Sequence, residues 1–395
     1  MRKGIKVISY ADLTGYGTAG DAYLRGLIRA RQPLLWQPFI FRGEKYIPYT
    51  EDPGRLRIFH PQHSQNIDDD KCLMAAIESR LEYDTLYMHT QPQYWPHYWE
   101  KGIRRVGYTV WETDHIPGHW KDLLNTADRI LVPCHFNTEV FRSDGVKRPV
   151  SVIPHILRTP SDLSDDEAAD FRSRLGISGD RFVFYTINTW TARKALRDTI
   201  TAFLEAFTDQ DPVTLIVKTD PLGALNEDTP ELVSTARIIA GLIAGRPNVP
   251  DIRVICRLMS VREIDLLHRT GDCFLSLTHS EGWGLGAFDA AGLGNPVIIT
   301  GWGGQLDYLG TDYFGLVDYR LVPVPDFKGT EPYDPGQHWA DADREHAVQL
   351  MRDIVHNPAA ARKKSEMTGA TIRASFSESS VIQRLVETLN GSNTR

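Results

Sequence analysis

Residues 273–300 read "CFLSLTHSEGWGLGAFDAAGLGNPVIIT", two apolar runs separated by a glycine-rich loop and a helical stretch. The pattern predicts strand, loop, helix and strand, which is the β-α-β unit of parallel sheets. Both runs are continuously apolar, as is typical of strands that are covered on both faces. This stretch therefore indicates an α/β fold.

The same alternation extends over most of the chain. Strand-like runs separated by amphipathic segments are "IKVISY", "RLRIFH", "DTLYMH", "RRVGYTVW", "RILVP" and "VSVIP", and later "RFVFYTI", "VTLIVK" and "IRVIC". Two such series predict two doubly wound, Rossmann-like parallel-sheet domains. The break at "LRTPSDLSDDEAADF" places their boundary near residue 158. We expect one domain over 1–157, completed by a final helix within 376–395, and a second over 158–375. The proline-rich stretch 322–339 is either a surface excursion or a lid.

Composition narrows the class of protein. The 395 residues are 42% hydrophobic and 24% charged, and no apolar run approaches the roughly 18 residues of a membrane span, so we expect a cytoplasmic protein. Four scattered cysteines without a C-x-x-C pair argue against disulfides and a zinc site. A net charge of -7 disfavours nucleic acid. Residues 1–157 hold 20 basic and 18 acidic residues, which leaves 24 and 33 of the 44 and 51 for the remainder, so the first half is better suited to an anionic partner.

The loop of the opening stretch suggests a ligand that combines hydroxyls with phosphate. Glu281 accepts hydrogen bonds only and suits vicinal hydroxyls, and Asp289 on the following helix suits a second set. The amides of Gly284 and Leu285, at the start of that helix, form a seat for an anion. The alternative is a glycine-rich turn with a capping acid and a solvated aspartate.

A second loop, within "FYTINTWTARKALRDTITAFLEAF", places Arg193 and Lys194 directly before a predicted helix. A cation is unfavourable at the positive end of a helix dipole unless an anion lies beside it. Lys194 is therefore a candidate anion ligand, and Arg193 a second one.

Residues 280–297 resemble the signature of the retaining family-4 glycosyltransferases of the GT-B class, in which two acids separated by seven residues span a glycine-rich loop. The matching residues are Ser280, Glu281, Gly282, Gly284, Leu285, Gly294, Pro296 and Val297. Asp289 stands where the family usually has glutamate, so a ligand would have to approach about 1.5 Å closer. The resemblance implies two facing domains that bind a nucleotide-diphosphate sugar between them, mostly through the second.

The resemblance also implies a role for each candidate residue of the second domain. Glu281 would contact the transferred sugar and Asp289 the ribose, with Gly282, Trp283, Gly284 and Leu285 lining the donor. Lys194 matches the family's diphosphate-binding lysine. The family's arginine is missing from its usual place, which holds Asn188 or Thr189, although Arg193 is nearby. Leu258 and Met259 occupy the place of the loop that holds the nucleotide base.

In the first domain, Gly15 and Gly17 resemble the glycine loop that closes over the donor phosphates, although a G-x-G can also be a tight turn. Glu112 and Asp114 follow a predicted strand and would lie on the acceptor side, where either could orient a hydroxyl. A structural or capping pair is an equal alternative.

The resemblance implies an enzyme of the hexosyltransferase type that moves a sugar, with retention, to a glycan, lipid-linked or small-molecule acceptor. We expect no cofactor and no metal, because "DDD" at 68–70 and "DAD" at 341–343 both lie at predicted helix starts, where acids are favoured anyway. A peripheral contact of the first domain with the inner face of a membrane is a further expectation. The alternatives are an epimerase or phosphorylase with the same fold, or a silent binder of sugar nucleotides.

Overall fold

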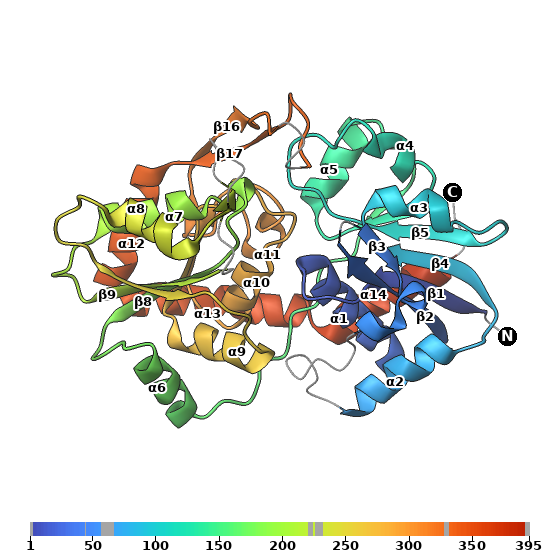
Figure 1. Cartoon of the computed structure of the whole chain (residues 1–395), viewed down its shortest axis with the longest axis horizontal. Coiled ribbons are helices and arrows are strands. Elements are labelled where there is room, and N and C mark those ends of the chain that lie inside the picture. Colours follow the sequence, from blue (N-terminus) through green and yellow to red (C-terminus); the bar gives the residue numbers. More distant parts are fainter. Residues whose placement is uncertain are drawn as a thin grey trace. The chain divides into compact units, whose positions relative to one another are not determined.

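The computed structural model describes residues 3–43, 45–56, 67–219, 224–225, 232–327 and 332–391, with the backbone alone at 67–69, 224–225 and 232–233. The chain divides into two compact units (Figure 1). The first unit holds Met1–Arg158, Val324–Gln337 and Ser375–Arg395, and the second holds Thr159–Pro323 and His338–Ala374.

The first unit is built on a seven-stranded sheet of order β3-β2-β1-β4-β5-β6-β7, in which β3 alone is antiparallel to its neighbour. Its strands are β1 Gly4–Tyr10, β2 Leu34–Arg42, β3 Lys45–Pro48, β4 Tyr83–His89, β5 Arg104–Tyr108, β6 Arg129–Val132 and β7 Val150–Val152. Its helices are α1 Gly15–Arg29, α2 Ile67–Glu78, α3 Trp95–Tyr98, α4 Trp120–Leu124, α5 His135–Ser143 and α14 Glu378–Asn390, with 3-10 turns η1 Tyr49–Glu51, η2 Pro53–Arg55 and η3 Pro92–Tyr94.

The second unit is built on a six-stranded, wholly parallel sheet of order β12-β9-β8-β13-β14-β15. Its strands are β8 Phe182–Ile187, β9 Val213–Lys218, β12 Asp251–Ile255, β13 Cys273–Ser276, β14 Val297–Thr300 and β15 Leu316–Val317, with hairpins β10 Ala224–Leu225 with β11 Leu232–Val233 and β16 Tyr319–Pro323 with β17 His338–Ala342. Its helices are α6 Asp165–Arg174, α7 Leu196–Ala206, α8 Thr235–Ile243, α9 Val261–Thr270, α10 Leu285–Gly292, α11 Leu306–Leu309, α12 Arg344–His356 and α13 Pro358–Ser375, with the 3-10 turn η4 Ala192–Lys194.

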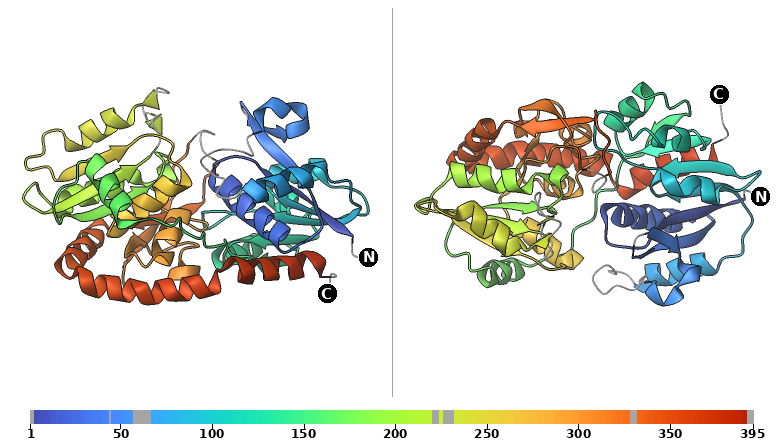
Figure 2. Two further views of the ribbon diagram at one scale, coloured as in Figure 1. Left: turned by 90° about the horizontal axis from the view of Figure 1, so that it is seen from below. Right: turned by 45° about the horizontal axis from the view of Figure 1, so that its top comes forward.

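Helices lie on both faces of each sheet (Figure 2), as the apolar strands require. In the second unit, Phe184 of β8, Leu215 of β9 and Leu275 of β13 pack with Ile200 and Phe203 of α7 in one buried core. Such burial of apolar surface is the main favourable term in folding.

The prediction of strands in the first half was wrong in one region. β2, which was not predicted from the sequence, pairs with β1 from Leu34 to Phe39, and Ser9 faces Pro38 in the register. Pro38 interrupts the apolar run "LLWQPFIFR", and proline is unusual inside a strand because it lacks an N–H donor. The run "RLRIFH" does not begin as a strand, since Arg55 lies in η2, and residues 57–60 lie outside the described part of the chain.

The segment 324–337 groups with the first unit, whereas the sequence assigned it to the second domain. Three contacts explain the difference. The Asp334 carboxylate accepts a hydrogen bond from the Gly118 amide at 2.7 Å, and the Gln337 side chain donates to the His115 carbonyl at 2.8 Å. The Tyr333 ring lies 5.6 Å from the Trp111 ring.

The last helix, α14, packs on the first unit. Ile382, Leu385 and Leu389 of α14 are buried in the same core as Leu24 and Leu27 of α1. Gly26 of α1 lies against Ile382, since a Cβ there would come within 2.5 Å of it. The helix thus completes a core whose other members come from the first part of the chain.

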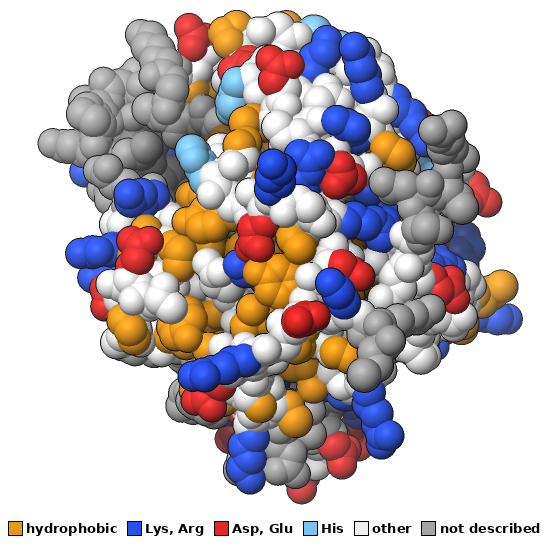
Figure 3. All heavy atoms as spheres, turned by 90° about the vertical axis from the view of Figure 1, so that its right-hand side faces the viewer, with side chains coloured by type: hydrophobic (Ala, Val, Ile, Leu, Met, Phe, Trp, Pro, Cys, Tyr) orange, Lys and Arg blue, Asp and Glu red, His pale blue; other side chains and the backbone are white. Residues whose placement is uncertain are grey.

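Among the described helices, none has the length and apolarity needed to cross a membrane. Figure 3 shows one face of the first unit, where hydrophobic side chains gather near the middle and charged side chains lie around and among them.

Candidate functional site

The candidate residues of the second unit follow parallel strands. Glu281 follows β13, Lys194 follows β8, and Leu258 follows β12. Because the carboxyl ends of parallel strands lie at one edge of the sheet, these loops share that edge, which is where ligands bind in open α/β sheets.

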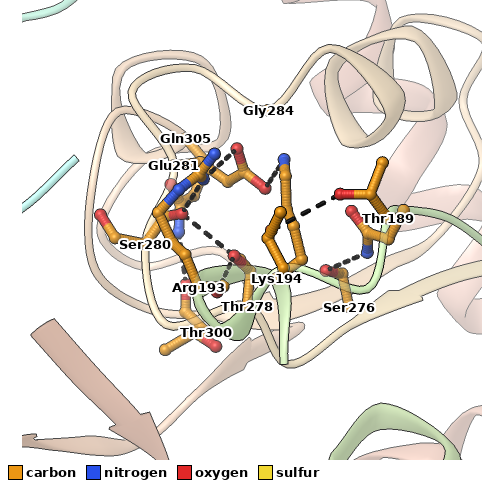
Figure 4. A network of polar contacts seen from close by, with 12 residues as sticks. Thr189, Arg193, Lys194, Ser276, Thr278, Ser280, Glu281, Gly284, Thr300 and Gln305 are labelled. Carbon is orange, nitrogen blue, oxygen red and sulfur yellow. Dashed lines mark hydrogen bonds and ion pairs between the residues drawn. The ribbon is translucent and has the colours of Figure 1, made fainter. Parts of the chain in front are cut away.

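Glu281 lies between two cations at this edge (Figure 4). The Lys194 ammonium is 2.6 Å from Oε1, and the Arg193 guanidinium is 3.2 Å from Oε2. Glu281 is buried, which by itself would raise the pKa of its carboxyl, but Lys194 and Arg193 outweigh that effect and hold the pKa below its ordinary value. The carboxylate is therefore ionised, and the anion that Lys194 needs beside the helix is supplied by the protein itself.

The two cations are carried by η4, the turn that leads from β8 into α7. Ala195 follows in the left-handed conformation, with φ of 43°, and directs the chain into α7. The Arg193 carbonyl accepts hydrogen bonds from the His279 amide at 2.8 Å and from the Thr278 hydroxyl at 3.1 Å. The turn that holds the cations is thus fixed to the loop that holds the carboxylate.

The Glu281 backbone is fixed from the other side by the loop after β14. The Gly304 amide donates to the Glu281 carbonyl at 2.7 Å. Gly303, with φ of 120°, lies so close that a Cβ would come within 2.7 Å of the same carbonyl oxygen. A side chain at 303 would therefore displace Glu281.

Helix α10 begins directly after the glutamate loop. Gly284 precedes it in the left-handed conformation, with φ of 83°, and the Tyr308 hydroxyl donates to the Gly284 carbonyl at 3.3 Å. Burial raises the pKa of Tyr308, and the charges of Glu281 and Asp289 raise it further. Tyr308 is thus an uncharged hydrogen-bond donor whose hydroxyl is influenced by the charges of Glu281 and Asp289, the two acids predicted from the sequence.

Two residues predicted to bind the donor have buried side chains with structural contacts. The Trp283 indole packs 5.1 Å from each of the Phe288 and Tyr308 rings. The Asn188 amide group donates to the hydroxyls of Thr186, at 3.1 Å, and Ser276, at 3.0 Å, and so joins the ends of β8 and β13.

The loop expected to hold the nucleotide base contains one exposed and one buried candidate residue. Leu258 is 58% exposed, whereas Met259 is buried. The Arg257 guanidinium donates to the Leu258 carbonyl at 3.1 Å and pairs with Glu263 at 2.6 Å, so this arginine stabilises the loop.

In the first unit, the glycine loop lies next to the loop of Glu112. Gly15 begins α1, and its Cβ position is open, whereas a Cβ on Gly17 would come within 2.2 Å of the Asp12 carboxylate. Between them, the Tyr16 hydroxyl is 2.9 Å from the Thr109 hydroxyl. The charge of Glu112 contributes to a raised pKa of Tyr16, although burial is the larger cause.

Asp114 lies beside an ion pair between His115 and Asp144. The His115 Nδ1 is 2.6 Å from the Asp144 carboxylate, and its Nε2 is 3.9 Å from Asp114. The hydrogen bond to Asp144 raises the pKa of His115, and Asp114 adds a smaller electrostatic contribution. Asp144 also accepts from the Ile116 amide, so this pair stabilises the loop.

The structure brings Glu281, Lys194, Arg193 and Gly284 together in one network. It adds three residues to which the sequence analysis gave no role: His279, Gly304 and Tyr308. His279 lies within the stretch 273–300 with which the sequence analysis begins, so a signal existed for it, whereas Gly304 lies beyond that stretch. Tyr308 had none, because a tyrosine in a short helix is more often a core residue. Within the described ranges, no cluster of three or more metal-ligating side chains occurs; the side chains of residues 68 and 69 lie outside those ranges.

No protein-family model matches the chain. The chain is 24% identical over 311 residues to an alpha-monoglucosyldiacylglycerol synthase of Streptococcus pneumoniae, a match that covers 73% of this chain and 64% of that protein. It therefore spans less than two thirds of the length of this curated relative.

Solved structures share the fold over the whole chain. A glycosyltransferase from Rickettsia africae superimposes with a TM-score of 0.67 at 14% identity and covers 98% of both chains. Anabaena HepE in complex with UDP-glucose superimposes with a TM-score of 0.63 at 15% identity and covers 98% of this chain and 99% of its own. The predicted fold class, an α/β protein of the GT-B type, is confirmed, as is the resemblance to glycosyltransferases of that class.

Proposed function

We propose that this protein is a retaining glycosyltransferase that uses a nucleotide-diphosphate sugar as donor. The second unit binds the donor and the first unit binds the acceptor. UDP-glucose is the first donor to test, because the streptococcal relative is named as a glucosyl-lipid synthase and HepE was solved with UDP-glucose.

The observation that carries the proposal is the buried carboxylate of Glu281 between Lys194 and Arg193. Burying a carboxylate between two partly buried cations is costly, and structural stability alone is a weak reason for it. At the carboxyl edge of a parallel sheet, next to the amino end of α10, the arrangement suits a ligand that carries both hydroxyls and phosphates.

Each charged group has a defined task in the proposed reaction. Lys194 and Arg193 bind the diphosphate, and the first-turn amides of α10 add dipoles of the same sign. The bond between the anomeric carbon and the diphosphate oxygen breaks, and its electron pair stays on the diphosphate. The acceptor oxygen then bonds to that carbon on the same face, and its proton passes to the departing diphosphate. The cations stabilise charge that grows as the bond breaks.

Glu281 has two tasks in sequence. Without donor it neutralises Lys194 and Arg193, and with donor it accepts hydrogen bonds from the sugar hydroxyls. Asp289, on the first turns of α10, binds the ribose. We propose that the reaction needs no metal, because the two cations supply the charge that a metal would otherwise supply.

The acceptor is proposed by class only: a glycan, a lipid-linked glycan or a small molecule with a hydroxyl group. Glu112, beside the Tyr16 loop, is the residue we assign to orienting that hydroxyl. Contact of the first unit with the inner face of a membrane is part of the proposal for a lipid-linked acceptor.

The test is titration calorimetry with UDP-glucose, GDP-glucose and ADP-glucose in the presence of EDTA, followed by transfer assays with the three acceptor classes. We expect one donor to bind without metal and NMR of the product to show the anomeric configuration of the donor. Absence of binding by every sugar nucleotide contradicts the proposal. Binding with turnover that needs no acceptor indicates an epimerase, and binding without any turnover indicates a silent binder.

A further inference from the structure

His279 links three segments at the candidate donor site. Its amide donates to the Arg193 carbonyl at 2.8 Å, and its carbonyl accepts from the Ala340 amide at 3.0 Å. Its imidazole Nδ1 is 2.7 Å from the Ala340 carbonyl oxygen. A carbonyl oxygen can only accept, so Nδ1 carries the hydrogen in this contact.

The imidazole replaces a backbone hydrogen bond. When two residues of neighbouring antiparallel segments form a hydrogen-bonded pair, each uses its own N–H and C=O toward the other. His279 cannot do so with Ala340, because its N–H is committed to the Arg193 carbonyl. Its side chain supplies the missing donor, and Ala340 retains both of its hydrogen bonds.

The partner strand is well fixed. Ala340 is in β17, opposite Leu321 of β16, and is fully buried. The neighbouring Trp339 is also buried, and its ring stacks on the His279 imidazole with centroids 4.6 Å apart and planes 12° apart. His279 therefore contacts the hairpin through its ring face and through one ring nitrogen.

We propose that His279 is a positioning residue for the donor site. It uses its imidazole to fasten the glutamate loop to β17 and leaves its amide to hold the turn that carries Arg193 and Lys194. The β16–β17 hairpin then acts as a support for Glu281, two residues further along the chain. The inference rests on the proposed function for the identity of the donor, but the positioning itself is independent of it.

The test separates the hydrogen bond from the ring contact. His279→Asn keeps a donor nitrogen at the position of Nδ1 and loses the stacked ring. His279→Phe keeps the ring and loses the donor, and His279→Ala loses both. Leu321→Ala is the matched control. Leu321 lies opposite Ala340 in the hairpin and is 49% exposed, and its aliphatic side chain forms no hydrogen bond.

Two measurements are needed. Hydrogen–deuterium exchange of residues 277–284 reports positioning without any ligand. We expect faster exchange in His279→Ala and His279→Phe and near wild-type exchange in His279→Asn and Leu321→Ala. For UDP-glucose affinity, we expect a loss of about five- to tenfold in the Ala and Phe variants, and of less than about twofold in the Asn variant, as the loss of one hydrogen bond implies.

The outcomes are distinguishable. If His279→Phe behaves as wild type and His279→Asn does not, the ring contact holds the loop and the proposed hydrogen bond is overturned. Equal exchange in all variants overturns the positioning role. If the wild type binds no sugar nucleotide, the proposed function fails, while the exchange data still decide the role of His279.

Discussion

The polar side chains that are buried at the carboxyl ends of the strands differ between the two units. In the second unit, buried Glu281 lies against Lys194 and Arg193. In the first unit, β4 ends at His89 and β5 ends at Tyr108, and their rings lie 4.5 Å apart. Burial is the main reason why the pKa of His89 is lowered to about 3, so this ring is uncharged at neutral pH.

The difference shows two ways to bury polar groups at the same edge of the same kind of sheet. His89 and His155 are neutral and surrounded by aromatic rings, and the Tyr23 hydroxyl is 3.0 Å from the His155 Nδ1. Neutral groups cost less to bury than charges do. Burying the Glu281 carboxylate in the second unit therefore costs more free energy than burying the neutral rings of the first. This larger cost is explained if a bound ligand replaces Glu281 as the partner of Lys194 and Arg193. These contacts lead to four predictions that can be tested.

Glu281→Gln should have the largest effect. The amide keeps the shape but loses the charge, so we expect transfer to fall by about 10²- to 10³-fold, on the scale of losing one preorganised electrostatic contact. UDP should bind as well as before or more tightly, because Lys194 and Arg193 lose their internal anion. Transfer rates and calorimetry with UDP measure both effects. Near-normal transfer would remove Glu281 from the mechanism.

Lys194→Ala should weaken donor binding by about 10- to 100-fold, since a charge-assisted hydrogen bond contributes roughly 1.5–3 kcal/mol. The matched control is Arg197→Ala, an exposed cation on the first turn of α7. We expect the loss in Lys194→Ala to be smaller at high salt. Equal donor affinities in the two variants would contradict the assignment of the diphosphate to Lys194.

The neutral histidines should make the first unit sensitive to acid. The pKa of His155, like that of His89, is lowered to about 3 by burial. Between pH 6.5 and 3 the unfolded chain binds more protons than the folded one, so stability is full above about pH 6.5 and falls as the pH is lowered, by ~1.4 kcal/mol per pH unit for each histidine.

His89→Leu should therefore reduce the loss of melting temperature between pH 7 and pH 5, whereas His97→Asn, at an exposed position, should not. Thermal melts monitored by circular dichroism at several pH values provide the measurement. An unchanged pH dependence in His89→Leu would show that this ring is not neutral in the folded protein.

The smallest effect is expected at the glycine loop. Gly17→Ala places a Cβ 2.3 Å from the Asp12 carbonyl oxygen, and we expect a loss of about 1–3 kcal/mol in the free energy of unfolding. Gly15→Ala meets no atom within 4 Å and should not reduce stability. Urea unfolding compares the two. If Gly15→Ala nevertheless lowers transfer, its role is in binding; if Gly17→Ala is as stable as wild type, the loop rearranges freely.

The sequence predicted most of the sheet architecture because continuous apolar runs mark buried parallel strands. It missed β2, where Pro38 interrupts the run. The cation turn and the glutamate loop could also be predicted, since loops after parallel strands share one edge. The sequence left open whether Arg193 lies at the site. The structure places its guanidinium 3.2 Å from the Glu281 carboxylate, and its role in the reaction stays a prediction.

The rest depends on contacts between residues far apart in the chain. The carbonyl of Glu281 is held by Gly304, and His279 is held by Ala340, sixty-one residues later. No local pattern carries that information. For the same reason the segment 324–337 was assigned to the wrong unit, since it has no periodicity of its own and is fixed by Gly118 and His115.

The division of the chain also sets the order in which its parts can be completed during synthesis. All residues of the second unit have been made once Ala374 has been added, whereas the first unit still lacks α14, with its buried Leu385 and Leu389. All parts of the second unit are thus made before the first unit is complete, and the first unit keeps an apolar surface uncovered until α14 has been added. A chain truncated after residue 374 should therefore be cleaved by protease within residues 1–158 more readily than the full chain.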